Sequence, residues 1–132
     1  MRPYQGKGRK LDIVQMITQI RQRPDFDKVG MVLAHNGVVR GTSRDGRKVS
    51  GLTVSVDHDK LARILEKERQ TPGIVDIQIE IAENRDLAVG DDVMVLVVAG
   101  DIRDTVIKVL ERTLNAVKKT VTRKTEFFSH EP

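Results

Sequence analysis

The apolar run from Val93 to Ala99 is the feature that most constrains the fold of this 132-residue chain. The run is too short to cross a membrane, which takes about 20 residues, and it has the length of a β-strand. A strand that is apolar on both faces is buried on both, so we expect it to lie in the centre of a sheet. The sequence therefore predicts a layered fold around residues 93–99.

The periodicity of the remaining apolar residues predicts helices and strands on either side of that run. Helical spacing predicts helices over residues 11–21, 57–70 and 101–119. Alternation or short apolar runs predict strands over residues 30–40, 49–56, 75–81 and 120–128. The resulting order, α-β-β-α-β-β-α-β, indicates an α+β sandwich with a mixed or antiparallel sheet and not a doubly wound nucleotide-binding fold.

Residues 30–56 are predicted to form a β-hairpin with a basic loop. Gly37 interrupts the first strand, as a bulge would. The Asp45-Gly46 pair in the polar segment that follows favours a tight reversal between two strands. We therefore expect this hairpin to be a subdomain of the fold.

Composition places the chain among small globular proteins. We expect one α+β domain over residues 11–132, preceded by a flexible basic arm over residues 1–10. The absence of cysteine excludes a disulfide framework, a thiolate metal site and a cysteine nucleophile. The three histidines have no ligand spacing, and no phosphate-binding glycine motif is present, so neither a metal nor a cofactor is expected. Without a signal peptide or membrane span, the expected location is the cytoplasm.

Basic residues stand at the ends of several predicted elements. The net charge of +4 and the pI near 9.6 favour an anionic partner, although a solvated basic face explains the charge equally simply. The candidates are Arg40 at a strand end, Arg103 in the first turn of the long helix, and Lys118, Lys119, Arg123 and Lys124 at its exit. Arg103 is the most informative, because a cation opposes the helix dipole there unless it faces a phosphate or carboxylate.

Four motifs occur in an order and spacing that resemble a known family. They are Gly37-Val38-Val39-Arg40, Val89-Gly90-Asp91-Asp92-Val93 before the apolar strand, Arg103 at a helix start, and Lys118-Lys119-Thr120 at the helix end. Over residues 28–126 the chain resembles the large, catalytic subunit of molybdopterin synthase. The resemblance implies a two-layer α/β hammerhead-like fold with a long helix in its C-terminal half.

The same resemblance implies a sulfurtransferase of molybdenum cofactor biosynthesis. Such an enzyme inserts two sulfurs into cyclic pyranopterin monophosphate and so forms the dithiolene of molybdopterin. The sulfur comes from the C-terminal thiocarboxylate of a small ubiquitin-like subunit. The implied assembly is a heterotetramer around a homodimer of large subunits.

The family's functional residues correspond to basic residues of this chain. Lys119 matches the catalytic lysine, with Lys124 as the nearest match to a second one. Arg40 and Arg103 match residues that bind the substrate phosphate, and Lys118 and Arg123 are expected to assist them.

Two alternatives remain open at this stage. Ile102 stands where the family has a histidine, and the segment after Lys119 is shorter than in the family. Both departures favour a non-catalytic paralogue that binds a pterin or a partner subunit. The high pI alternatively allows a module that binds nucleic acid or another polyanion, although the scarcity of aromatic residues disfavours single-strand recognition.

Overall fold

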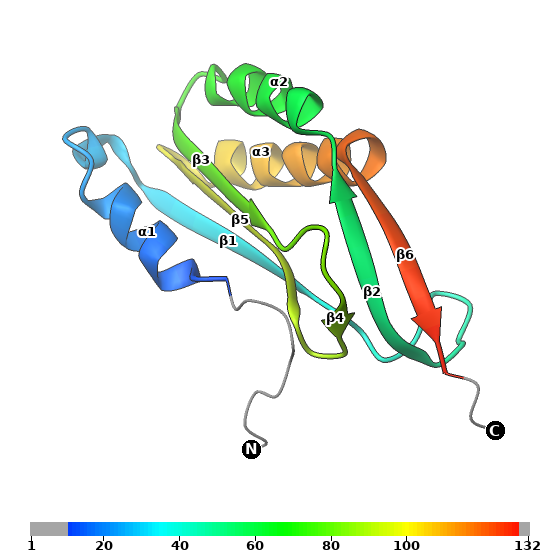
Figure 1. The fold of residues 1–132 in the computed structure, drawn as a ribbon. Coiled ribbons are helices and arrows are strands. Elements are labelled where there is room, and N and C mark those ends of the chain that lie inside the picture. The colour runs from blue at the N-terminus through cyan, green and yellow to red at the C-terminus, as the bar shows by residue number, and fades with distance from the viewer. Residues whose placement is uncertain (1–10, 130–132) are drawn as a thin grey trace.

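The computed structural model describes residues 11–129 as an α+β fold (Figure 1). Its helices are α1 (Ile13–Arg21), α2 (His58–Arg69) and α3 (Arg103–Ala116), with a 3-10 turn, η1 (Phe26–Lys28), and a π-helical turn, η2 (Val117–Val121). Its strands are β1 (Met31–Val38), β2 (Val49–Val56), β3 (Ile74–Ile81), β4 (Leu87–Ala88), β5 (Asp92–Gly100) and β6 (Thr122–Phe128). The predicted succession of elements is confirmed, with β4 added. The predicted arm, residues 1–10, lies outside the described part of the chain.

Strand β5 is the centre of the main sheet, as its apolar run predicts. The strand order is β1-β5-β3, and both neighbours pair with β5 in antiparallel register, so of the two predicted kinds of sheet the antiparallel one is present. Leu96 and Val98 belong to the hydrophobic cluster that faces α2 and α3, whereas Val95 and Val97 belong to the cluster that contains α1. Each such side chain stabilises the fold by about 1.5–3 kcal/mol when fully buried, which makes β5 the main contributor to the core.

Helices cover both faces of this sheet (Figure 1). The Asp57 carboxylate begins α2 by accepting a hydrogen bond from the Lys60 backbone N–H at 3.1 Å. Asp12 caps α1 in the same way, and Met16 and Ile20 are the buried residues of that helix. In the described residues, no helix is long and apolar enough to span a membrane.

The predicted hairpin of residues 30–56 is wrong. Strand β1 pairs with β5, whereas β2 lies in a second sheet of order β4-β2-β6. Strand β5 is buried in the centre of its sheet and pairs on one edge with β3 and on the other with β1, so β1 is a partner of β5 and not of β2. The alternation of β2 is instead matched by β6, whose Lys124 and Glu126 lie opposite Val54 and Leu52.

The Asp45-Gly46 turn forms inside the connection between the two sheets. Gly46 has a φ of 86°, which is accessible to glycine without strain, and a single antiparallel bridge joins Thr42 to Lys48. The reversal is therefore local and ends after a few residues. The predicted bulge at Gly37 is confirmed by the shift of the β1–β5 register between Gly37 and Val38.

Helix α3 ends three residues earlier than predicted and continues as the π-helical turn η2. The Thr120 hydroxyl donates to the Ala116 carbonyl at 2.8 Å, and the Val121 carbonyl accepts from the Asp57 N–H at 2.9 Å. Val117 and Val121 are buried on either side of the two lysines. This wide turn thus fixes where Lys118 and Lys119 lie, and such turns are common at functional sites.

Candidate functional site

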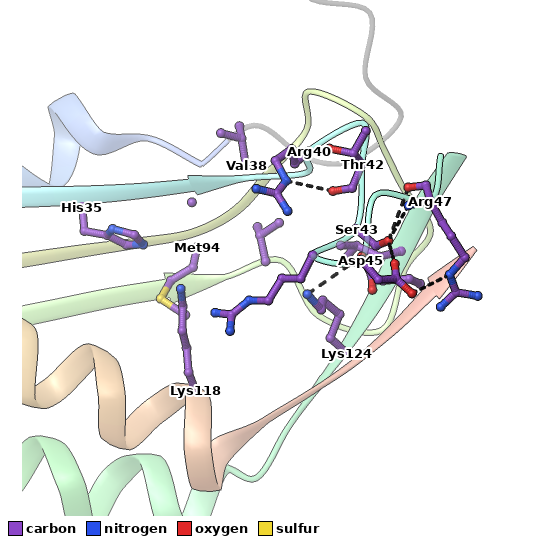
Figure 2. Close-up of a pocket in the computed structure, with 15 residues that line it drawn as sticks. His35, Val38, Arg40, Thr42, Ser43, Asp45, Arg47, Met94, Lys118 and Lys124 are labelled. Carbon is purple, nitrogen blue, oxygen red and sulfur yellow. Dashed lines mark hydrogen bonds and ion pairs between the residues drawn. The ribbon is translucent and has the colours of Figure 1, made fainter. Parts of the chain in front are cut away.

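A pocket lies between the end of β1, the connection to β2, the turn η2 and the middle of β6. Its volume is about 560 Å³, within the range of small-molecule sites. Gly37, Val38, Val93 and Met94 contribute from the main sheet, and Leu52 contributes from the second. Figure 2 shows His35, Arg40, Lys118 and Lys124 among the side chains around it.

Cations outnumber carboxylates in the lining of this pocket. The charged residues are Arg40, Arg44, Arg47, Lys118, Lys124, Asp45 and Glu126. The two carboxylates are already engaged, Asp45 with Arg47 at 2.9 Å and Glu126 with Lys124 at 4.0 Å. Within residues 11–129, Arg40, Arg44 and Lys118 form no ion pair. An anion that enters the pocket therefore meets three cations without an acidic partner, which is the arrangement that binds phosphate or carboxylate.

Local hydrogen bonds hold the cationic loop in place. The Arg40 Nε donates to the Thr42 carbonyl at 2.8 Å, which orients the guanidinium at the pocket (Figure 2). The Ser43 hydroxyl donates to the Asp45 carboxylate, and this bond, followed by contacts with Arg47, lowers the pKa of Asp45. The Arg47 guanidinium also lies 3.8 Å from the centre of the Phe128 ring, which ties the loop to β6.

Lys118, and not Lys119, is the lysine of η2 that lines the pocket. Both lysines are exposed, but only Lys118 is among the residues that line the pocket. The resemblance had assigned the catalytic position to Lys119. Within η2, the amine that lines this pocket lies one residue before that position.

The predicted site residues only partly converge. The pocket brings together Arg40, Lys118 and Lys124, but not Lys119, Arg103 or Arg123. Arg103 is exposed in the first turn of α3, and the 14 residues of that helix place it about 20 Å from its C-terminal end. Because side chains alternate along a strand, Arg123 lies on the opposite face of β6 from Lys124, where it lines a second pocket with Arg85 and Thr53.

His35 lines the same pocket, although it is not selected from the sequence, because the three histidines are scattered along the chain. Its ring lies close to Gly37: a Cβ atom added to Gly37 would lie 3.4 Å from Nε2 of His35. Partial burial lowers the pKa of His35, and the nearby positive charge of Lys118 lowers this pKa further. His35 and Gly37 lie two residues apart in one strand, which places them on the same face of the sheet. Because Gly37 belongs to the motif that resembles the family, this spacing is the sequence feature that points to His35.

The lowered pKa of His35 predicts a loss of stability in mild acid. Because the folded state holds the His35 proton less tightly than the unfolded chain, protonation favours unfolding. This destabilisation is absent above the ordinary value of 6.5 and grows as the pH falls below it. Thermal unfolding between pH 7.5 and 5.5 should therefore show a steeper decrease in Tm for the native chain than for His35→Phe. Equal slopes would contradict this prediction.

Within the described residues, no three histidine, cysteine, aspartate or glutamate side chains converge as metal ligands would. The comparison with protein families then decides what kind of chain carries this pocket. The family described as MoaE protein matches residues 7–120. The chain belongs to the MoaE family. MoaE proteins are large subunits of molybdopterin synthase, so the chain has a role in molybdenum cofactor biosynthesis.

Solved structures share the MoaE fold at low sequence identity. Molybdopterin synthase from Staphylococcus aureus has a TM-score of 0.75 and 20% identity, over 92% of this chain and 88% of that chain. A MoaE protein from Burkholderia ambifaria has a TM-score of 0.69 and 17% identity, over 94% and 88%. A complex of subunits 1 and 2 of molybdopterin-converting factor from Helicobacter pylori has a TM-score of 0.68 and 16% identity, over 92% and 82%. A search of curated proteins gave no match.

Proposed function

We propose that this MoaE-family chain is the catalytic subunit of a molybdopterin synthase, which inserts sulfur into cyclic pyranopterin monophosphate. The observation that carries the proposal is the pocket in which Arg40, Arg44 and Lys118 line one space, with no acidic partner among residues 11–129. The substrate's phosphate is an anion that two guanidinium groups match in geometry. The Lys118 ammonium would lie beside the reacting atoms, where it can stabilise developing negative charge or transfer a proton.

The sulfur donor in this proposal is the C-terminal thiocarboxylate of a small ubiquitin-like subunit. A thiocarboxylate is itself an anion, so the positive pocket would attract the partner's tail as well as the substrate. The Helicobacter pylori structure contains two subunits of molybdopterin-converting factor, which supports a two-subunit assembly for this chain. The reaction would take place in the cytoplasm.

A homodimer of large subunits within a heterotetramer completes the proposal. Arg103 lies at the far end of α3 from Lys118, so it cannot serve the pocket of its own chain. An Arg103 with a role in phosphate binding would therefore have to come from a second copy. Arg123, on the opposite face of β6 from Lys124, is similarly left to contacts outside this pocket.

Reconstitution of the reaction tests the proposed activity. The full chain is mixed anaerobically with the thiocarboxylated small subunit and cyclic pyranopterin monophosphate, and molybdopterin is the expected product. The matched control is the same small subunit with an ordinary C-terminal carboxylate, which should give none. Substrate binding without product formation would instead favour the non-catalytic paralogue. The observation behind this alternative is Ile102, which stands where the family has a histidine and is 58% exposed at the start of α3.

A further inference from the structure

His35 is the residue of the pocket for which the proposed phosphate site gives no role. It projects from β1 on the same face as Gly37, and its cross-strand partner is Leu96. No hydrogen bond joins its ring to another residue in the described range 11–129. The ring is only partly buried, so its nitrogens can bind the solvent or a ligand inside the pocket. Figure 2 shows the ring beside the space into which Lys118 extends.

The charges around His35 come from three other segments. Lys118 extends from the turn after α3, the connection to β2 contributes Arg40, Arg44, Arg47 and Asp45, and β6 contributes Lys124 and Glu126. The carboxylates of Asp45 and Glu126 are each paired with a cation, so the net field at the imidazole is positive. That field, together with partial burial, disfavours a proton on His35 while the pocket is empty.

We propose that His35 is a proton-linked part of the anion site, neutral in the empty pocket and protonated when a dianion is bound. A dianion among Arg40, Arg44 and Lys118 would cancel the repulsion that keeps the imidazole neutral. The imidazolium then becomes an additional N–H donor to the anion. This inference rests on the proposed function, because it takes the pocket to be the phosphate site.

Linkage gives the inference its measurable form. If the bound anion favours the protonated imidazole, a lower pH must favour the bound anion to the same degree. Binding should therefore be accompanied by proton uptake. A histidine with a purely structural role in β1 would show neither effect.

Sulfate is a suitable probe because its charge does not change between pH 5.5 and 8. At constant ionic strength, the native full-length chain should bind sulfate about fivefold or more tightly at pH 5.5 than at pH 8. His35→Phe should lose the gain, so that its affinity for sulfate changes little between pH 8 and pH 5.5. His58→Phe is the matched control, because His58 is exposed on α2 and pairs with Glu83 away from the pocket, and it should behave as the native chain does.

The proton itself can be followed by an NMR titration of the histidine rings, with His35→Phe identifying the His35 signal. Saturation with sulfate should raise the pKa of His35. In the sulfate-free protein, Lys118→Ala should raise it as well, and Lys119→Ala should raise it less. If sulfate binds with the same affinity at both pH values and leaves this pKa unchanged, the role of His35 is overturned while the anion site stands. If sulfate binds at neither pH, both the anion site and the role of His35 are overturned.

Discussion

Substitution of Lys118 by alanine is expected to lower the rate of molybdopterin formation by about 10²- to 10⁴-fold, the usual contribution of a positioned acid–base group. Lys118 is the lysine of η2 that lines the pocket, and its ammonium has no acidic partner in the described part of the chain. Initial rates with saturating thiocarboxylated partner measure the loss. Lys119→Ala removes the same charge one residue away, outside the pocket, and is expected to retain activity within about threefold.

Lys118→Arg separates the positive charge of this residue from its ability to give up a proton. Arginine stays protonated at any relevant pH, so this variant should bind the substrate phosphate normally but turn over slowly if Lys118 transfers a proton. Near-native turnover would instead show that the charge alone is required. A Lys118→Ala enzyme with full activity beside an inactive Lys119→Ala enzyme would restore the assignment that the sequence resemblance favours.

The elements of the fold were predictable because their apolar patterns are strong. The run of β5 is apolar on both faces, and a strand of that kind has few places other than the centre of a sheet. The partners of β2 were not predictable in the same way. Alternation in residues 49–56 says which face is buried but not which strand pairs with it, and the Asp45-Gly46 turn indicates only a local reversal.

The candidate site was predictable in its chemistry and less so in its geometry. Arg40 and Lys124 were identified from position along the chain, and both line the pocket. The choice between Lys118 and Lys119 depends on the path of a π-helical turn, which no local pattern shows. Arg103 was selected because a cation at a helix start favours a bound anion and because the resemblance matches it to a phosphate-binding residue. A helix of 14 residues keeps it far from the lysines at the other end.

Substitution of Arg112 by alanine is expected to cause a large loss of stability although the residue lies outside the pocket. Glu68 of α2 is 4% exposed, and its carboxylate accepts hydrogen bonds from Arg112 of α3. The Nη2 donates to Oε1 at 2.5 Å, and the single Nε hydrogen is shared between the two oxygens, at 2.8 and 2.9 Å. These bonds raise the pKa of Arg112 and join the two helices that cover the sheet. Removal of the guanidinium leaves a buried carboxylate without its cation, which typically lowers the free energy of unfolding by about 3–5 kcal/mol. We expect the lower end, about 3 kcal/mol, because the Arg112 side chain is half exposed to water.

Chemical denaturation of the full chain measures this loss as a lower free energy of unfolding. Lys108→Ala, an exposed position on the same helix, should change the free energy of unfolding by less than about 0.5 kcal/mol. The double variant Glu68→Leu/Arg112→Leu should recover most of the lost stability, because replacing both charges removes the unpaired carboxylate and adds apolar contact. If the single and double variants are equally unstable, the loss comes from the missing ion pair between α2 and α3. It would then not come from the cost of a buried Glu68 carboxylate that has no cation.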